Sequence, residues 1–106
     1  MSERRSVMGV FAAVVVAATT VSADNVPGDR PPCVVIYPHS WNAGPGWNHL
    51  VTVTNHCAYA VHCQITTNAN PAPTMADVAA GGEETVNTFL YSPIQGFTPV
   101  ANCAQR

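Results

Sequence analysis

The chain has 106 residues, of which 47% are hydrophobic and only 9% are charged, so it has room for one small domain. It contains no lysine. From residue 24 onward, five acidic residues and two arginines leave a net charge of −3. Two cations cannot neutralise a phosphate backbone or hold the chain on an anionic bilayer, so we expect neither nucleic acid nor a membrane surface as a partner.

The first 23 residues have the pattern of a cleavable signal peptide. Two arginines form a basic start, residues 7–21 carry no charge, and Val21 and Ala23 occupy the two positions that a signal peptidase reads. The apolar run of about 15 residues is shorter than the ~20 that a membrane-spanning helix needs. We therefore predict cleavage after Ala23 and a secreted or periplasmic protein without a membrane anchor.

The next segments are a lead-in and a first strand. Residues 24–32, DNVPGDRPP, are polar and rich in proline, which predicts an extended and flexible lead-in. Residues 33–37, CVVIY, predict a strand that is buried on both faces or covered by a neighbour. Pro38 is expected to end this strand, because proline cannot donate to a ladder of hydrogen bonds.

Two tryptophans flank an Ala-Gly-Pro-Gly turn within residues 39–48. Because large aromatic side chains are more often buried than displayed, we expect this loop to fold back and cap an open end of the domain. The alternative is that Trp41 and Trp47 display their indole rings together. They would then form a platform that binds a carbohydrate or a peptide.

Residues 50–73 predict the centre of the fold, a hairpin of strands 49–55 and 60–67 with a proline-rich exit. The pattern is a strict alternation of apolar and polar residues, typical of strands with one face in a core. The residues predicted to face inward are Val51, Val53, Val61, Cys63 and Ile65, and those predicted to face water include Thr52, Thr54, His62, Gln64 and Thr66.

Three more strands are predicted, at residues 74–79, 85–91 and 97–103. The glycines at positions 81 and 82 indicate a tight turn before the second of these. No stretch after residue 23 has a helical period over two turns. The fold class that follows is all-β, a small antiparallel β-sandwich of about six strands over residues 33–106.

Four cysteines follow the predicted signal peptide, at positions 33, 57, 63 and 103, and an even number in an exported chain predicts two disulfides. Pairing 57 with 63 and 33 with 103 would contribute about 2.4 and 4.4 kcal/mol of loop entropy, against about 3.5 and 3.9 for pairing 33 with 57 and 63 with 103. These totals do not decide between the two. Strand parity favours Cys57 with Cys63 and Cys33 with Cys103.

The run VTVTN, VHCQITTN and VAAGGEETV within residues 50–90 resembles the immunoglobulin-like sandwich modules of bacterial secreted and surface proteins. The resemblance rests on turn residues, and the tryptophan and inter-sheet cysteine pattern of antibody domains is missing. It implies an immunoglobulin-like fold and a role as a spacer, adhesin or filament component. It implies no catalytic residue.

Histidines supply the main candidate for metal chemistry. His56 and His62 both face outward near the turn of the predicted hairpin, where two imidazoles on paired strands would hold copper or zinc. The cysteines nearby are needed for disulfides, which removes their thiolates as ligands. Solvated histidines without a metal, and hence no cofactor, are the leading expectation.

The candidate catalytic pairs do not form a recognisable motif. Ser40 follows His39, but neighbouring residues of an extended chain point to opposite sides. His49 with Asp77 lacks an activated serine motif, and the two glutamates at 83 and 84 lie beside a glycine turn. We therefore predict a protein that is not an enzyme.

The function that the sequence favours is structural or adhesive. The outward positions of the central strands are uncharged and β-favouring, and no lysine protects the edges of the sheets from pairing with another chain. We expect a secreted surface, filament or adhesive component that binds a protein partner, or another copy of itself, by strand addition. A copper or zinc protein and a carbohydrate or peptide binder are the alternatives.

Overall fold

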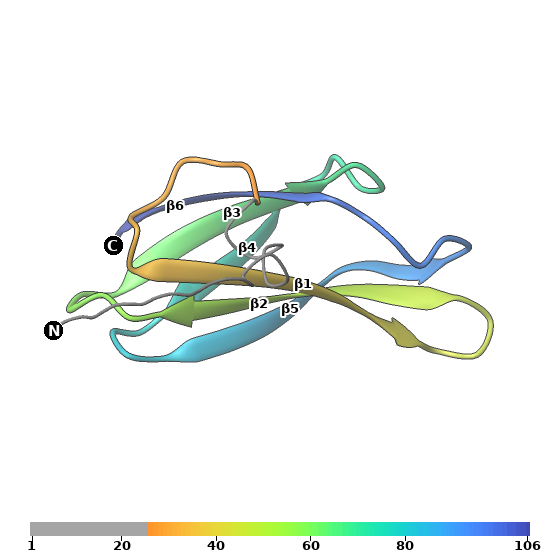
Figure 1. Ribbon diagram of the computed structural model, residues 1–106, viewed down its shortest axis with the longest axis horizontal. Coiled ribbons are helices and arrows are strands. Elements are labelled where there is room, and N and C mark those ends of the chain that lie inside the picture. Colours follow the sequence, from red (N-terminus) through yellow and green to blue (C-terminus); the bar gives the residue numbers. More distant parts are fainter. Residues whose placement is uncertain (1–25) are drawn as a thin grey trace, which may run out of the picture.

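Residues 26–106 are described by a computed structural model, in which six strands form two three-stranded antiparallel sheets (Figure 1). The strands are β1 (Val34–Asn42), β2 (Trp47–Asn55), β3 (Val61–Thr67), β4 (Thr74–Val78), β5 (Glu83–Ser92) and β6 (Pro99–Gln105). The first sheet has the order β1-β2-β5 and the second the order β4-β3-β6. The prediction of an all-β fold with about six strands is confirmed. The predicted signal peptide lies outside the described residues.

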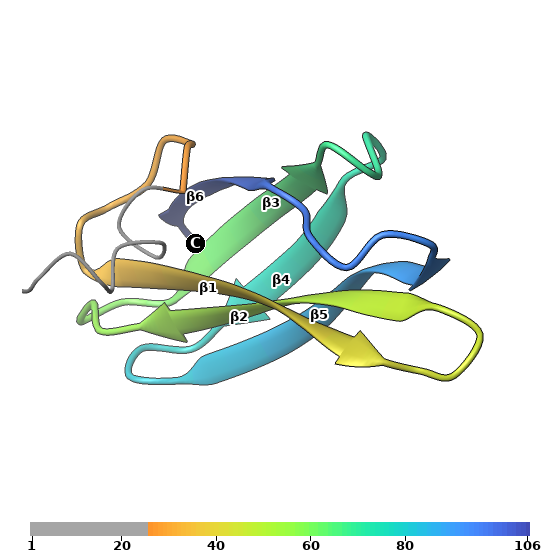
Figure 2. The same ribbon diagram turned by 45° about the vertical axis from the view of Figure 1, so that its right-hand side comes forward.

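The two sheets face each other, and the strands of the second cross those of the first obliquely (Figure 2). Their facing sides form one core with buried residues from β1, β2, β3, β4 and β6, and the partly buried Val86 of β5 packs against it. Its buried members on the strands are Val34, Ile36, Val51, Val53, Val61, Cys63, Ile65, Ala76, Val78, Ala101 and Cys103. All five residues that the alternation of residues 50–73 predicted to face inward are fully buried.

The predicted hairpin between residues 49–55 and 60–67 is wrong, because β2 and β3 lie in different sheets. Residues 56–60 carry the chain from one sheet to the other. β2 pairs with β1 and β5, whereas β3 pairs with β4 and β6. The alternation of apolar residues fixes which face of a strand is buried, but it is the same for a hairpin and for two strands that face each other across a core.

β1 also differs from its prediction. Its side chains alternate, with Val34 and Ile36 buried and Val35 and Tyr37 exposed, so it is not buried on both faces. It continues through Pro38, which lies opposite Val51 of β2, and ends at Asn42. A proline is tolerated there because β1 is the outermost strand of its sheet.

The two disulfides join Cys33 to Cys57 and Cys63 to Cys103. The preferred pairing of the sequence analysis is therefore wrong and its alternative is correct. Cys63 lies directly opposite Cys103 in the ladder between β3 and β6, with their Cα atoms 4.0 Å apart. Cys57 follows β2 and meets Cys33 at the start of β1, the partner of β2. Two disulfides indicate formation in an oxidising compartment.

Residues 26–30, part of the predicted lead-in, lie along the outer edge of β6. The carbonyl oxygens of Pro27 and Asp29 accept hydrogen bonds from the backbone N–H groups of Ala101 (3.0 Å) and Cys103 (2.9 Å). Gly28 has a φ of 131°, and a Cβ at this position would lie 2.0 Å from the carbonyl oxygen of Ala101. Only glycine fits between this segment and β6.

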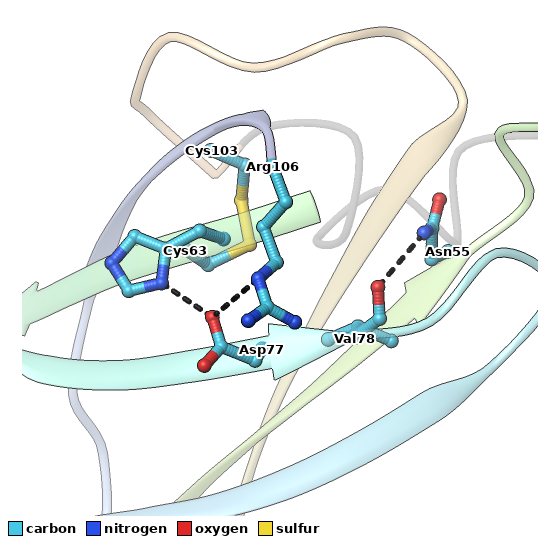
Figure 3. A network of polar contacts seen from close by, with 7 residues as sticks. Asn55, Cys63, Asp77, Val78, Cys103 and Arg106 are labelled. Carbon is cyan, nitrogen blue, oxygen red and sulfur yellow. Dashed lines mark hydrogen bonds and ion pairs between the residues drawn. A yellow bond between two sulfur atoms is a disulfide. The ribbon is translucent and has the colours of Figure 1, made fainter. Parts of the chain in front are cut away.

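A buried asparagine links the two sheets at the end of β2. The side-chain nitrogen of Asn55 donates to the carbonyl oxygens of Tyr59 (2.9 Å), Val78 (3.2 Å) and Ala79 (3.1 Å), and its side-chain oxygen accepts from the N–H of Cys57 (2.9 Å). Figure 3 shows the bond from Asn55 to Val78 at the end of β4. Asn55 is fully buried, so these bonds fix the chain where it leaves the first sheet.

We expect Asn55→Asp to lower the free energy of unfolding by about 2 to 4 kcal/mol, because it removes every N–H of this buried side chain and leaves three carbonyl groups without their donor. Urea titration of the oxidised protein measures the change. Asn42→Asp is the matched control. Asn42 is exposed and uses only its side-chain oxygen, as acceptor for the N–H of Gly44, so a change within about 0.5 kcal/mol is expected. Equal losses in the two variants would contradict the role of Asn55.

Candidate functional site

The outer face of the first sheet carries a row of side chains along β1. Val35, Tyr37, His39 and Trp41 are spaced two apart and therefore share one face of the strand. Val35, Tyr37 and Trp41 are 37%, 54% and 60% exposed. The His39 ring stacks on that of Tyr37, with the ring centroids 5.2 Å apart. We call these four side chains the outer row. The two-residue spacing of these side chains is present in the sequence through residue 41, but a strand that ends at Pro38, as predicted, does not include His39 and Trp41.

Hydroxyl groups continue this face beside the outer row. The Nε2 atom of His39 lies 3.2 Å from the hydroxyl of Thr52, which in turn lies 2.8 Å from the hydroxyl of Thr85 on β5. The hydroxyl of Thr54 donates to Glu83 over 3.4 Å. The strand pairing places these groups side by side across all three strands. The face is thus aromatic on one side, hydroxylated in the middle, and acidic only near Glu83.

The two tryptophans do not lie on the same face. Trp41 is opposite Asn48, whereas Trp47 is opposite Asn42 and has the parity of the buried His49. Residues 39–48 are not a loop that caps the domain, because they belong to the two strands and to a tight turn closed by a bond from the N–H of Ala43 to the carbonyl of Gly46. A platform that uses Trp41 and Trp47 together does not form. Trp41 instead aligns with Tyr37 and His39.

The inner face of this hairpin is covered by the loop between β5 and β6. His49 is fully buried, and its ring stacks on that of Phe97, with the centroids 4.3 Å apart. Its Nε2 atom donates to the carbonyl of Ile94 (2.8 Å), and the hydroxyl of Ser40 donates to the carbonyl of Gln95 (2.5 Å). Residues 93–98 therefore replace the second sheet as the cover of this end, and the outer face is the one left to solvent.

The predicted histidine pair is not brought together on one hairpin. His56 is exposed in the connection between the sheets, whereas His62 lies on the outer face of the second sheet. The Nδ1 atom of His62 is 2.5 Å from a carboxylate oxygen of Asp77, which also lies 3.7 Å from the Nε atom of Arg106 (Figure 3). Among residues 26–106, no three His, Cys, Asp or Glu side chains are grouped so that they could hold a metal ion.

The catalytic pairs considered from the sequence are also separated. His39 bonds to Thr52 on the outer face of its sheet, while Ser40 bonds to Gln95 beneath the inner face. His49 is enclosed by Phe97 and Ile94, whereas Asp77 is exposed on the other sheet. Neither pair shares a proton in this structure.

The hydrogen-bond register shows which backbone groups face outward at each edge of the two sheets. In β1, the bonds between Ala43 and Gly46 and between His56 and Cys33 mean that odd-numbered residues bond to β2. The even-numbered residues therefore face the free edge. Pro38 is among them and has no N–H, and the N–H of Val34 is already bonded to the carbonyl of Pro31. The edge of β1 is interrupted.

The two edges of the second sheet are also protected. In β6, the outward N–H groups of Ala101 and Cys103 are bonded to the segment of residues 26–30. β4 has only five residues, and one of its two outward-facing positions is the charged Asp77. Short edge strands, charges and covering segments are the usual protection against unwanted strand pairing.

The edge of β5 is ten residues long, contains no proline and has no covering segment over residues 83–87, and Glu83 is its one charged outward-facing residue. The bond from the N–H of Asn55 to the carbonyl of Gly82 continues the ladder between β2 and β5, so Glu84 and Val86 bond to β2 and residues 83, 85 and 87 face outward. Within the described part of the chain, nothing bonds to the outward backbone groups of these three residues. The free side of β5 is unoccupied in both ribbon views (Figures 1 and 2). We call residues 83–87 the open edge.

The open edge was missed in the sequence, although its signal is present: a run of ten strand residues contains neither proline nor lysine. Which of its residues face outward is known only from the hydrogen-bond register of β5 with β2.

Comparisons of the chain with protein-family profiles, with curated proteins and with solved structures found no match. No helix in residues 26–106 is long and apolar enough to cross a membrane.

The cluster of His62, Asp77 and Arg106 predicts a pH dependence. The hydrogen bond with His62 lowers the pKa of Asp77, the Arg106 guanidinium lowers it further, and partial desolvation opposes both. Because the folded pKa lies below the unfolded one, this carboxylate stabilises the fold above about pH 4 and loses that effect as the pH falls through the folded pKa. Urea titrations between pH 5 and pH 2 should therefore show a shallower fall in stability for Asp77→Asn than for the unmodified protein. Parallel curves would contradict this assignment.

Proposed function

We propose that this protein is a secreted, non-enzymatic interaction domain, a surface or adhesive component, that binds a partner by adding the partner's strand to the open edge. One observation carries the proposal: three of the four sheet edges are interrupted, covered or short and charged, whereas the edge of β5 presents unbonded N–H and C=O groups. In strand addition, the main chain supplies the affinity and alternate side chains supply the specificity.

The side chains of the open edge suit this mode of binding. Thr85 and Asn87 are exposed, uncharged and directed to the outer face, where Thr85 already lies beside Thr52. Val86 packs against the core and holds β5 in place. The open edge ends where the side-chain nitrogen of Asn70 donates to the carbonyl of Thr88 (2.5 Å). A partner strand of about five residues would find backbone groups that are already held in strand geometry and have no hydrogen-bond partner.

We further propose that the two sheets are an immunoglobulin-like sandwich with strands missing. β1-β2-β5 would correspond to strands A, B and E, and β4-β3-β6 to C′, C and F. In the constant-type arrangement, strand D pairs with E, so its absence leaves the edge of β5 open. Strand G pairs with F, and residues 26–30 take its place along β6.

Selection from a displayed library of ten-residue peptides tests strand addition directly. We expect peptides that bind the unmodified protein and lose at least tenfold in affinity to Thr85→Pro, because proline removes the outward N–H at the centre of the open edge. The pairing of β5 with β2 remains, since the N–H of residue 85 is not part of that ladder. Thr85→Ala keeps the N–H and is the matched control. If no selected peptide distinguishes these two variants, strand addition at β5 is wrong.

The outer row favours a second candidate function, carbohydrate binding. Tyr37 and Trp41 are more than half exposed on one face, beside the hydroxyl of Thr52 and the amide of Asn48. Exposed aromatic rings next to uncharged hydrogen-bonding groups suit the apolar faces and hydroxyls of sugars. On a glycan array, we expect Trp41→Ala to abolish binding and Trp47→Phe to retain it, because Trp47 lies on the other face. Equal losses in both variants, or no glycan bound, would contradict this candidate.

A further inference from the structure

We infer that the strand added at the open edge is β5 of a second copy of this chain, paired antiparallel about a two-fold axis at Thr85. The inference rests on the proposed function and names the partner of that site. Two identical edges pair well only when the groups that meet across the axis are complementary. The residues of the open edge meet that condition in one particular register.

The backbone register sets the geometry. Because residues 83, 85 and 87 all direct their N–H and C=O groups outward, each is suited to a hydrogen-bonded antiparallel pair. When the two-fold axis of the pairing passes through Thr85, residue 83 of one copy lies opposite residue 87 of the other, and the two copies of residue 85 lie opposite each other. These three pairs would exchange about six hydrogen bonds, two for each pair. No backbone group of the open edge would remain unbonded.

The side chains are compatible with this register. On the outer face, Glu83 would lie opposite Asn87, whose amide donates to a carboxylate, and the two Thr85 hydroxyls would meet at the axis. The two copies of Glu83 would be about 13 Å apart, four residues along the strand. No two carboxylates lie directly opposite each other, although the two copies of Glu84 are diagonal neighbours on the inner face.

The result would be one continuous six-stranded sheet, three strands from each copy, in the order β1-β2-β5-β5-β2-β1. The axis is perpendicular to the sheet, so both outer faces lie on the same side, with an outer row at each end. The only edges of this sheet are then the two β1 strands, which Pro38 interrupts. The pairing is self-limiting and produces a dimer rather than a fibre.

Introduced thiols test both the dimer and its register. In the mature, disulfide-intact protein, Thr85→Cys places two thiols opposite each other at the axis, within the distance that a disulfide spans. Asn87→Cys, on the same strand, places them about 13 Å apart. We expect mild oxidation to give a covalent dimer for Thr85→Cys and little for Asn87→Cys, with the native disulfides intact in a peptide map. Equal cross-linking of the two variants, or none in either, would overturn the inference.

Charge at position 87 provides an independent test by sedimentation equilibrium. Asn87→Lys places an ammonium group opposite Glu83 of the other copy, whereas Asn87→Glu places a carboxylate there. We expect the first to lower and the second to raise the dimer Kd by about threefold or more, and Thr85→Pro to raise it at least about tenfold. A chain that is monomeric at millimolar concentration overturns the inference. If the chain is monomeric but selected peptides bind it and lose affinity in the Thr85→Pro variant, the dimer is wrong and the proposed strand addition stands. If no such peptide is found, both fail.

Discussion

The arrangement of the two sheets depends on the hydrogen bonds of the buried Asn55 side chain. It lies where the chain leaves β2, and it bonds to the connection of residues 56–60 and to the end of β4. A buried amide that satisfies three carbonyl groups admits few alternative geometries. The chain is therefore directed across the core into the second sheet instead of turning back beside β2. The disulfide between Cys33 and Cys57 closes the same corner from the side of β1.

With the sheets fixed in this way, each edge strand has its own environment. Residues 26–30 cover the edge of β6, Pro38 interrupts the edge of β1, and β4 has only five residues. These features protect against pairing with other chains, and each has a local cause in the sequence. β5 has no such feature, although it is the longest of the six described strands and its partly buried Val86 packs against the core. The contrast between one open edge and three protected ones is the main reason to regard β5 as functional.

The faces of the strands were predictable from the sequence, and their partners were not. Alternation identified the buried residues of β2 and β3 correctly, because burial of one face depends only on the strand itself. The hairpin, and the disulfide between Cys57 and Cys63 that followed from it, were wrong because neighbouring strands that face each other across a core have the same alternation. The prediction that Pro38 ends the strand is wrong because a proline is tolerated in an edge strand, and the position of a strand at the edge of a sheet is a tertiary property. For the same reason, neither the outer row nor the open edge was predicted.

The most direct test of the open edge and its pairing is amide hydrogen exchange, measured for each residue at low and at high protein concentration. At low concentration, the outward amides of residues 83, 85 and 87 should exchange rapidly, whereas those of Ala101 and Cys103, bonded to residues 26–30, should be protected. At high concentration, the three amides of the open edge should become protected and the other two should not change. Protection of residues 83, 85 and 87 in the dilute monomer, or rapid exchange at every concentration, would contradict the account.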